Sequence, residues 1–285
     1  MLASLTDVLR VAQSYRFAVG AFNTSNLEMT EAIIRAAEAM QAPVIVQTSE
    51  KALEYAGLET LAALIVARAK QSSVPVVLHL DHGRNLALIH DCIKTGYTSV
   101  MIDGSHLSYV DNVRATCAVV REAHVAGVSV EAELGTIGGQ EDSISAKIGF
   151  TDPSQVASFV RETRCDALAV GIGNSHGKPK PGERLDLKRL EQIRQYVSIP
   201  LVLHGASGTP EDEIRQAINF GICKINIDTD LRLAFAAAER KILASDPTVY
   251  DPRAILGPAI DAVEAVVKEK IALFGGVGAA SKVLA

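Results

Sequence analysis

The sequence predicts an α/β fold, specifically a single (β/α)8 barrel. Eight short apolar runs rich in β-branched residues alternate with longer segments whose apolar residues recur at three- and four-residue spacing. The 285 residues suit one such barrel, and no linker or low-complexity segment divides them. We therefore expect one domain over residues 1–285, with a C-terminal helical tail from about residue 250. A doubly wound open sheet is the alternative architecture.

The eight apolar runs give the expected strands, in chain order: Ala18–Phe22, Val44–Gln47, Val76–Leu80, Ser99–Ile102, Val128–Glu133, Ala167–Ile172, Pro200–Leu203 and Cys223–Ile227. Among the segments between them, Leu27–Met40, Gly57–Gln71 and Asp111–Ala126 show the clearest helical spacing. Proline near a first helical turn opens two further helices, at Asp152-Pro153 and at Thr209-Pro210.

All eight expected strands end in polar or ionisable residues. Barrel enzymes carry their chemistry at the carboxyl ends of the strands, so these residues define the expected site. Turn preferences explain some of the Asn, Asp and Ser, but not three histidines and a glutamate. The strand ends are Asn23, Ser49, Asp81-His82, Asp103, Glu133, Asn174–His176, His204 and Asn226–Thr229.

Three histidines at the ends of different strands point to a metal. His82, His176 and His204 are expected around one mouth of the barrel, whereas the remaining histidines need no common role. Three neutral imidazoles with an open fourth position are typical of a catalytic divalent metal site, zinc above all. Gly83, directly after His82, is expected to let the chain turn.

Carboxylates accompany these histidines. Asp81 precedes His82 and has two open roles: supporting a ligating imidazole, or transferring a proton to a substrate oxygen. Asp103 and Glu133 are buried supports or a secondary cation position.

The loops after the last two strands predict a phosphate site. Gly205–Gly208 is a small-residue loop that leads to the helix at Pro210, and Asn226–Thr229 leads into another helix. Two long loops, Thr136–Phe150 and Ser175–Arg184, are interpreted as lids that bring Glu141 and Lys180 to substrate.

Composition restricts the partners and the location. A net charge of −5 and a pI near 5.8 argue against nucleic acid or an anionic membrane. The four cysteines lie far apart without a CxxC pair, as in reduced intracellular proteins. No apolar run reaches the roughly 20 residues that span a bilayer. We expect a soluble cytoplasmic protein with a small-molecule substrate.

Several segments together resemble the class II, metal-dependent fructose-bisphosphate aldolases, of the shorter class IIB kind that also includes tagatose-bisphosphate aldolases. The resemblance covers nearly the whole chain. Its motifs are AFNTSNLE, HLDHG, VMIDGSH, VEAELGTIGGQED, GNSHGKPKPG, LVLHGASG, KINIDTDLR and DPRAILGPA.

The resemblance implies roles for individual residues. His82, His176 and His204 would hold zinc, Asp81 would exchange a proton with the substrate C4 oxygen, and Glu141 would exchange the ketose C3 proton. Asp103 and Glu133 would form an alternative metal position. A monovalent cation, Na⁺ or K⁺, would accompany the phosphate. The implied substrate contacts are Asn23, Ser49, Gly177, Lys180, Gly205, Ser207, Asn226, Asp228 and Thr229.

The resemblance also implies fructose 1,6-bisphosphate as the substrate, cleaved to dihydroxyacetone phosphate and glyceraldehyde 3-phosphate, in a homodimer or homotetramer. Asp228 and the DPRAILGPA tail favour fructose over tagatose 1,6-bisphosphate. One position departs from the family pattern. Lys270 stands near the place of an arginine that reaches a neighbouring subunit's substrate phosphate, and lysine lacks the bidentate guanidinium.

Three alternative functional classes fit the residues less well than a metal-dependent aldolase. A Schiff-base aldolase needs a lysine at a strand end, usually the sixth, where this chain has Val170–Asn174. A metal-dependent hydrolase barrel commonly has an HxH pair in its first strand, and AVGAFN has none. A non-catalytic sugar-phosphate-binding barrel would have no use for Asp81 beside a metal.

Overall fold

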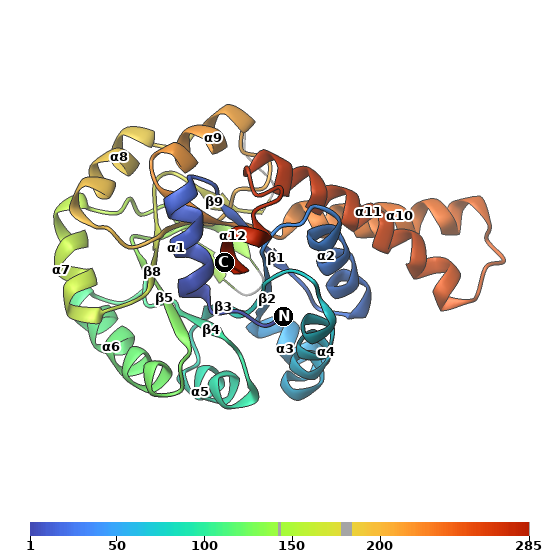
Figure 1. Ribbon diagram of the computed structural model, residues 1–285, viewed down its shortest axis with the longest axis horizontal. Coiled ribbons are helices and arrows are strands. Elements are labelled where there is room, and N and C mark those ends of the chain that lie inside the picture. Colours follow the sequence, from blue (N-terminus) through green and yellow to red (C-terminus); the bar gives the residue numbers. More distant parts are fainter. Residues whose placement is uncertain (142–143, 178–183, 285) are drawn as a thin grey trace.

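The computed structural model describes residues 1–141, 144–177 and 184–284. Its parallel strands close into an eight-stranded barrel in the order β1-β11-β10-β8-β5-β4-β3-β2, which confirms the predicted fold (Figure 1). The barrel strands are β1 (Val19–Asn23), β2 (Val44–Ser49), β3 (Val76–Gly83), β4 (Ser99–Ile102), β5 (Ser129–Leu134), β8 (Ala167–Val170), β10 (Leu201–Leu203) and β11 (Ile222–Ile227). Each overlaps one of the eight predicted runs, with bounds that differ by up to three residues.

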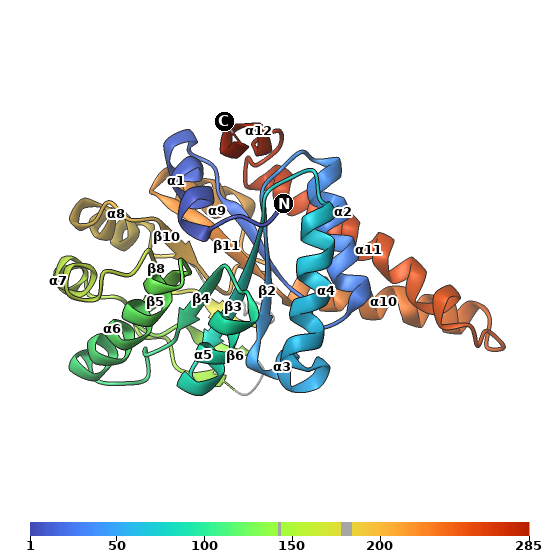
Figure 2. The same cartoon turned by 60° about the horizontal axis from the view of Figure 1, so that its bottom comes forward.

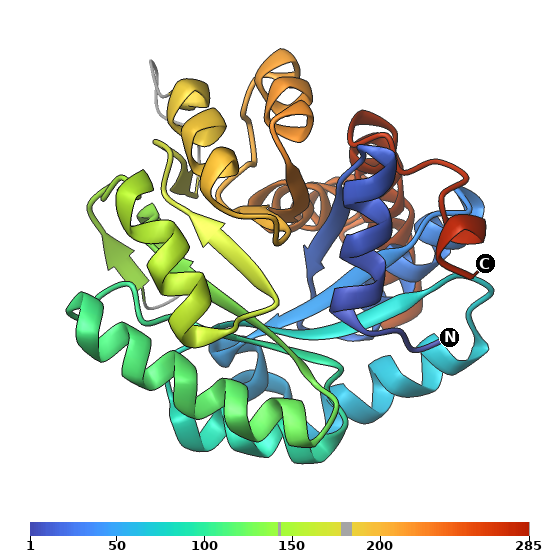
Figure 3. The ribbon, with the colours of Figure 1, turned by 60° about the vertical axis from the view of Figure 1, so that its left-hand side comes forward.

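Helices surround these strands on the outside of the barrel (Figure 3). They are α2 (Leu27–Ala39), α3 (Glu50–Ala56), α4 (Leu58–Gln71), α5 (Leu86–Thr95), α6 (Tyr109–Val125), α7 (Pro153–Thr163), α8 (Leu187–Tyr196) and α9 (Glu211–Asn219). Side-chain caps fix several of their first residues. Asp152 accepts a hydrogen bond from the Ser154 amide at the start of α7, as the Asp-Pro pair predicted. Ser108 caps α6, which therefore begins two residues before the predicted start at Asp111.

The amino-terminal helix α1 (Leu5–Tyr15) closes the bottom of the barrel. Its face of Leu5, Val8, Leu9 and Ala12 is buried. These side chains belong to one apolar cluster with strand residues that point into the barrel, namely Val19, Ile45, Val77, Met101, Ala169 and Val202. The amino ends of the strands are therefore sealed by hydrophobic packing, and polar side chains collect toward the other end.

Two long helices, α10 (Thr229–Ser245) and α11 (Pro252–Leu273), pack against each other and extend away from the barrel (Figures 1 and 2). Helix α11 also packs along α2, which anchors the pair to the barrel. Only Leu231 is buried in α10. A last short helix, α12 (Ala280–Leu284), contacts α1. Within the described part of the chain, no helix is long and apolar enough to cross a membrane.

A small second sheet joins the two segments that the sequence presents as loops. It contains β6 (Gly138–Glu141), β7 (Ile144–Ala146) and β9 (Ser175–His176) in the order β7-β6-β9. Gly138 pairs with Ser175, and Gly139 pairs with His176. The described parts of these segments thus include paired strands, whereas residues 142–143 and 178–183 lie outside the described residues.

Gly139 shows why this pairing needs glycine. Its φ is +87°, and a Cβ there would lie 2.2 Å from the carbonyl oxygen of His176. Any L side chain would push the two backbones apart. The Gly138-Gly139 pair thus allows β6 to approach the backbone that carries His176.

Candidate functional site

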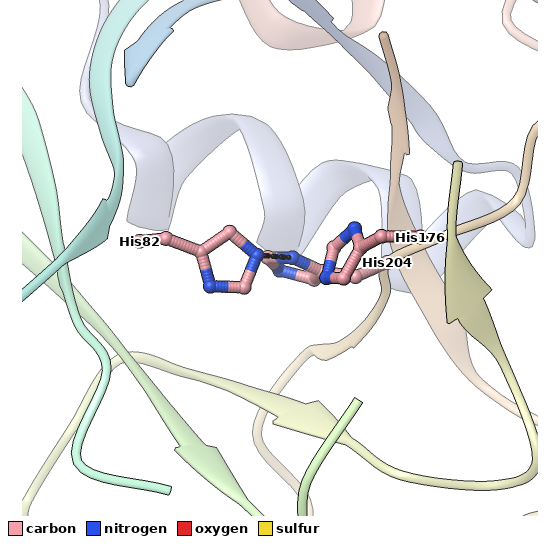
Figure 4. Close-up of side chains that lie close together, drawn as sticks. All are labelled: His82, His176 and His204. Atoms are coloured by element: carbon pink, nitrogen blue, oxygen red, sulfur yellow. Dashed lines mark hydrogen bonds between the residues drawn. The ribbon is translucent and has the colours of Figure 1, made fainter. Parts of the chain in front are cut away.

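The three predicted histidines converge at the carboxyl-end mouth of the barrel (Figure 4). Ring centroids are 4.9 Å apart for His82 and His176, 4.6 Å for His82 and His204, and 6.0 Å for His176 and His204. One nitrogen from each ring lies within 4.8 Å of the other two. All three side chains are buried. This arrangement could hold one metal ion between the rings.

His82 reaches this position through an unusual backbone conformation. Its φ is +48°, in the left-handed region that non-glycine residues seldom occupy. The pairing of β3 with β4 shifts register between Leu80 and Gly83, around the same residue. The turn therefore lies at His82, one residue before the predicted glycine. Glycine is needed at position 83 for a steric reason instead, since a Cβ there would lie 2.6 Å from the Met101 carbonyl oxygen.

The other two histidines come from different kinds of segment. His204 directly follows β10 and is fully buried, and its carbonyl oxygen accepts a hydrogen bond from Asn174 Nδ2 at 2.9 Å. His176 was predicted at a barrel-strand end but lies in β9, because the sixth barrel strand already ends at Val170. Its position depends on the pairing with Gly139 rather than on the barrel itself.

Carboxylates on the outer sides of two rings fix the direction of the lone pairs. His82 Nδ1 lies 3.3 Å from Asp103 Oδ2, and His204 Nε2 lies 2.8 Å from Glu131 Oε1. Protons on these nitrogens leave lone pairs on His82 Nε2 and His204 Nδ1, which face each other at 2.8 Å. Two facing lone pairs repel unless a proton or a metal ion lies between them. The donor set therefore fits a divalent metal that favours imidazole, as zinc does.

A second group of potential ligands lies behind His82. The side chains of His82, Asp103 and Glu133 bring one ligand atom each within 4.8 Å of the others. Burial, together with the nearby charge of Asp103, raises the pKa of Glu133 to about 8. Glu133 Oε2 accepts no hydrogen bond from the described residues, although it is buried. A cation at this position would neutralise the two carboxylates.

Arg84 already supplies part of that positive charge, and no pattern in the sequence pointed to this residue. Its Nε and Nη2 lie 2.8 Å and 2.7 Å from Asp103 Oδ2. Burial tends to raise the pKa of Asp103. Hydrogen bonds from His82 and Ser105, together with the charge of Arg84, outweigh burial and hold that pKa well below its usual range. Asp103 is therefore ionised and supports His82.

Asp81 is fully buried and accepts hydrogen bonds from three amide side chains. Asn23 Nδ2 and Gln47 Nε2 each donate to Oδ2 at 3.0 Å, and Asn226 Nδ2 donates to Oδ1 at 3.0 Å. These donors stabilise the ionised carboxylate beside the histidines. Asn23 and Asn226 were predicted to contact substrate, and their described partners include Asp81.

Gln47 was not among the predicted site residues. It also donates to Asn23 Oδ1 at 2.7 Å, so it connects Asn23 with Asp81. A glutamine inside an otherwise apolar strand was the available signal, because a buried amide needs partners. The partners themselves depend on the register, which places Asn23 of β1 beside Gln47 of β2.

The predicted phosphate loops lie next to the histidines. Gly205, directly after His204, has a φ of +60°, and a Cβ there would lie 2.4 Å from the Ser175 carbonyl oxygen. Ser207 is buried in the same loop, and Gly177 directly follows His176. Thr229 begins the 17-residue helix α10, whose first amides are suited to an anion.

Three of the remaining predicted residues have other described contacts. The Ser49 side chain caps α3 by accepting from the Ala52 amide at 3.3 Å. Asp228 Oδ1 accepts from Arg232 Nε at 2.7 Å. Lys270 Nζ lies 3.0 Å from Asp230 Oδ2 in the first turn of α10. Glu141 is the last residue of β6, and Lys180 lies outside the described residues.

Comparison with known proteins gives a consistent set of relatives. The profile of the family described as "Fructose-bisphosphate aldolase class-II" matches residues 3–279. A fructose-bisphosphate aldolase of Geobacillus stearothermophilus is 44% identical, with 99% of each chain covered. Another relative, from Bacillus licheniformis, is named 6-phospho-5-dehydro-2-deoxy-D-gluconate aldolase and is 42% identical over 97% of this chain and 96% of its own.

Solved structures agree with these relatives. The crystal structure of the YdjI aldolase from Escherichia coli K12 superimposes with a TM-score of 0.88 at 36% identity, covering 98% of this chain and all of that one. A putative fructose-1,6-bisphosphate aldolase from Coccidioides immitis gives a TM-score of 0.91 at 30% identity, with 98% of both chains covered.

Proposed function

Because this chain belongs to the class II fructose-bisphosphate aldolase family, we propose that it reversibly cleaves fructose 1,6-bisphosphate to dihydroxyacetone phosphate and glyceraldehyde 3-phosphate. The observation that carries this proposal is the position of Asp81. Its buried carboxylate accepts three amide hydrogen bonds and precedes one of three converging histidines. A group that moves a proton and a cluster suited to a metal are what an aldol cleavage requires.

The metal centre of the proposal is formed by His82, His176 and His204. A bound Zn²⁺ supplies Lewis acidity to a substrate carbonyl oxygen. Asp103 and Glu131 hold the His82 and His204 rings with their lone pairs turned inward. The group of His82, Asp103 and Glu133 is proposed as the alternative or secondary metal position.

Asp81 is the proposed proton carrier for the carbon–carbon bond. The amides of Asn23, Gln47 and Asn226 donate hydrogen bonds to both of its oxygens. As the C3–C4 bond breaks, the carboxylate takes the proton of the C4 hydroxyl. In the reverse direction it returns that proton to the new alcohol. Glu141 is proposed to exchange the proton at C3 of the three-carbon ketose.

The substrate's phosphate is proposed to bind at the loops after the last two barrel strands. Gly205 and Ser207 contribute one loop, and Thr229 begins a helix whose amino-terminal amides attract an anion. A Na⁺ or K⁺ ion is proposed beside them. The remaining proposed contacts are Asn23, Ser49, Gly177, Lys180, Asn226 and Asp228.

The oligomeric state, the domain organisation, the cellular location and the partners are also proposals. A homodimer or homotetramer would bring Lys270 to a neighbouring subunit's phosphate, whereas within its own chain Lys270 pairs with Asp230. We also propose one domain over residues 1–285, with the helical tail from about residue 250, in the cytoplasm. Neither nucleic acid nor a membrane is proposed as a partner.

The second candidate function is the cleavage of a related sugar phosphate. Tagatose 1,6-bisphosphate differs from the fructose compound in configuration at C4, the carbon whose oxygen faces Asp81 in this proposal. The 42% identical relative named 6-phospho-5-dehydro-2-deoxy-D-gluconate aldolase shows that similar chains carry other substrate names.

The test is a comparison of kcat/KM for the three compounds with purified protein. We expect fructose 1,6-bisphosphate to be preferred, and Asp228→Ala to reduce the ratio of fructose to tagatose cleavage. A wild-type preference for either other compound would refute the substrate assignment while leaving the aldolase family membership intact.

A further inference from the structure

Behind the histidines, the barrel interior holds a polar network centred on Lys224. Lys224 lies on β11 and Glu131 on β5, and both side chains are fully buried. Lys224 Nζ is 3.0 Å from Glu131 Oε2. Strands β10 and β8 separate β11 from β5 in the barrel, so this ion pair crosses the interior. A buried ammonium requires such a partner.

Lys224 also determines the orientation of the Asn226 amide. The two residues are two positions apart on β11 and therefore share one face of the strand. Lys224 Nζ donates to Asn226 Oδ1 at 2.7 Å. An ammonium has only donors, so the amide must present its oxygen to Lys224 and its Nδ2 to the other side. On that side, Nδ2 donates to Asp81 Oδ1 at 3.0 Å.

The second branch of the network leads to a histidine. Glu131 directs Oε2 to Lys224 and Oε1 to His204 Nε2, at 2.8 Å. The ion pair therefore fixes the rotation of the carboxylate. The carboxylate in turn favours the His204 tautomer whose proton is on Nε2, so that Nδ1 faces His82.

We propose that Lys224 is a positioning residue for the reaction. Its single charge holds the Asn226 amide against Asp81 and the Glu131 carboxylate against His204. One side chain thereby orients both the proton carrier and a metal ligand, and it does so without touching the substrate. The expected effect of Lys224 on kcat rests on the proposed aldolase function. Its effect on Zn²⁺ affinity can be measured independently of that function.

The test replaces Lys224 by methionine, which has a similar unbranched shape but no charge. Lys224→Met is expected to lower kcat and to weaken Zn²⁺ affinity, each by about 10- to 100-fold, with KM changed less than about threefold. Because the Asn226 amide is then free to rotate away from Asp81, the loss of activity should lie in kcat rather than in KM. Zn²⁺ affinity is measured by competition with a chelator.

Two further variants separate positioning from simple loss of stability. Lys188→Met makes the same chemical change on the exposed side of α8 and should leave all three readouts at their wild-type values. The double variant Lys224→Met/Glu131→Gln removes both buried charges, and its glutamine oxygen can still accept from His204. We expect it to fold and to recover Zn²⁺ affinity to within about threefold, while kcat stays low because Asn226 remains unanchored.

The proposal is overturned if either buried variant folds and keeps wild-type kcat, KM and Zn²⁺ affinity. A loss of thermal stability with those three readouts unchanged overturns it as well, since it would show a purely structural ion pair. If the wild type cleaves none of the tested sugar phosphates, the proposed function fails. The Zn²⁺ affinities of the single and double variants then decide the role of Lys224 alone.

Discussion

Nε2 of His82 lies 2.8 Å from Nδ1 of His204, while carboxylates hold the opposite nitrogen of each ring. The two histidines come from β3 and from the loop after β10, 122 residues apart in the chain. Their facing lone pairs account for the metal requirement that we propose. The roles of the surrounding residues can therefore be tested by measuring Zn²⁺ binding as well as cleavage activity.

Asp81→Asn should separate proton transfer from metal binding. The substitution keeps the size of the side chain but removes the negative charge that accepts the proton. We expect cleavage to fall by about 10²- to 10⁴-fold, with bound zinc unchanged. Steady-state kinetics and elemental analysis of the purified variant give the two quantities. Near-normal turnover would assign proton transfer to another group.

Gly139→Ala should disturb the metal site from outside the barrel. At a φ of +87°, the new methyl group would collide with the His176 backbone, so β6 and β9 must separate. We expect Zn²⁺ affinity to fall by at least about tenfold, which corresponds to 1.4 kcal/mol. Competition titration with a chelator measures it.

Gly127→Ala is the matched control for that variant. Gly127 also has a positive φ, +73°, but a Cβ there would meet nothing within 4 Å. It should lose only the roughly 1–2 kcal/mol of the left-handed backbone, with Zn²⁺ affinity unchanged. Equal Zn²⁺ affinities in the two variants would disprove the link between Gly139 and His176.

Arg84→Ala should open the secondary cation position. Without the guanidinium, Asp103 lacks its positive partner, so a second divalent ion should bind beside Asp103 and Glu133 at least about tenfold more tightly. Equilibrium dialysis against increasing Zn²⁺ followed by elemental analysis gives the stoichiometry. Arg84→Lys, which keeps the charge, should behave more like wild type. Identical binding curves for all three proteins would argue against competition between Arg84 and a cation.

The sequence was sufficient to predict the barrel and several of the residues that lie at its mouth. Each apolar run became a barrel strand because parallel strands buried on both faces need continuous β-branched residues. His82, His204 and Asp81 could be found because they stand where those runs end, and barrel strands deliver their ends to one mouth.

The residues that were missed depend on distant pairings. Gln47 supports Asp81 only because the β1–β2 register places it beside Asn23. Arg84 reaches Asp103 across neighbouring strands, and Lys224 reaches Glu131 across the barrel. The place of His176 in β9 depends on a strand pairing between two segments that read as loops. Hydrophobic periodicity contains no information on such contacts between segments.

Removing and restoring the metal is the sharpest test of zinc-dependent cleavage. The protein is stripped with a chelator, the loss of zinc is verified by elemental analysis, and fructose 1,6-bisphosphate cleavage is measured before and after Zn²⁺ is returned. We expect less than about 1% of the original rate in the stripped protein and recovery with one zinc per chain. Undiminished cleavage in verified metal-free protein would contradict this expectation.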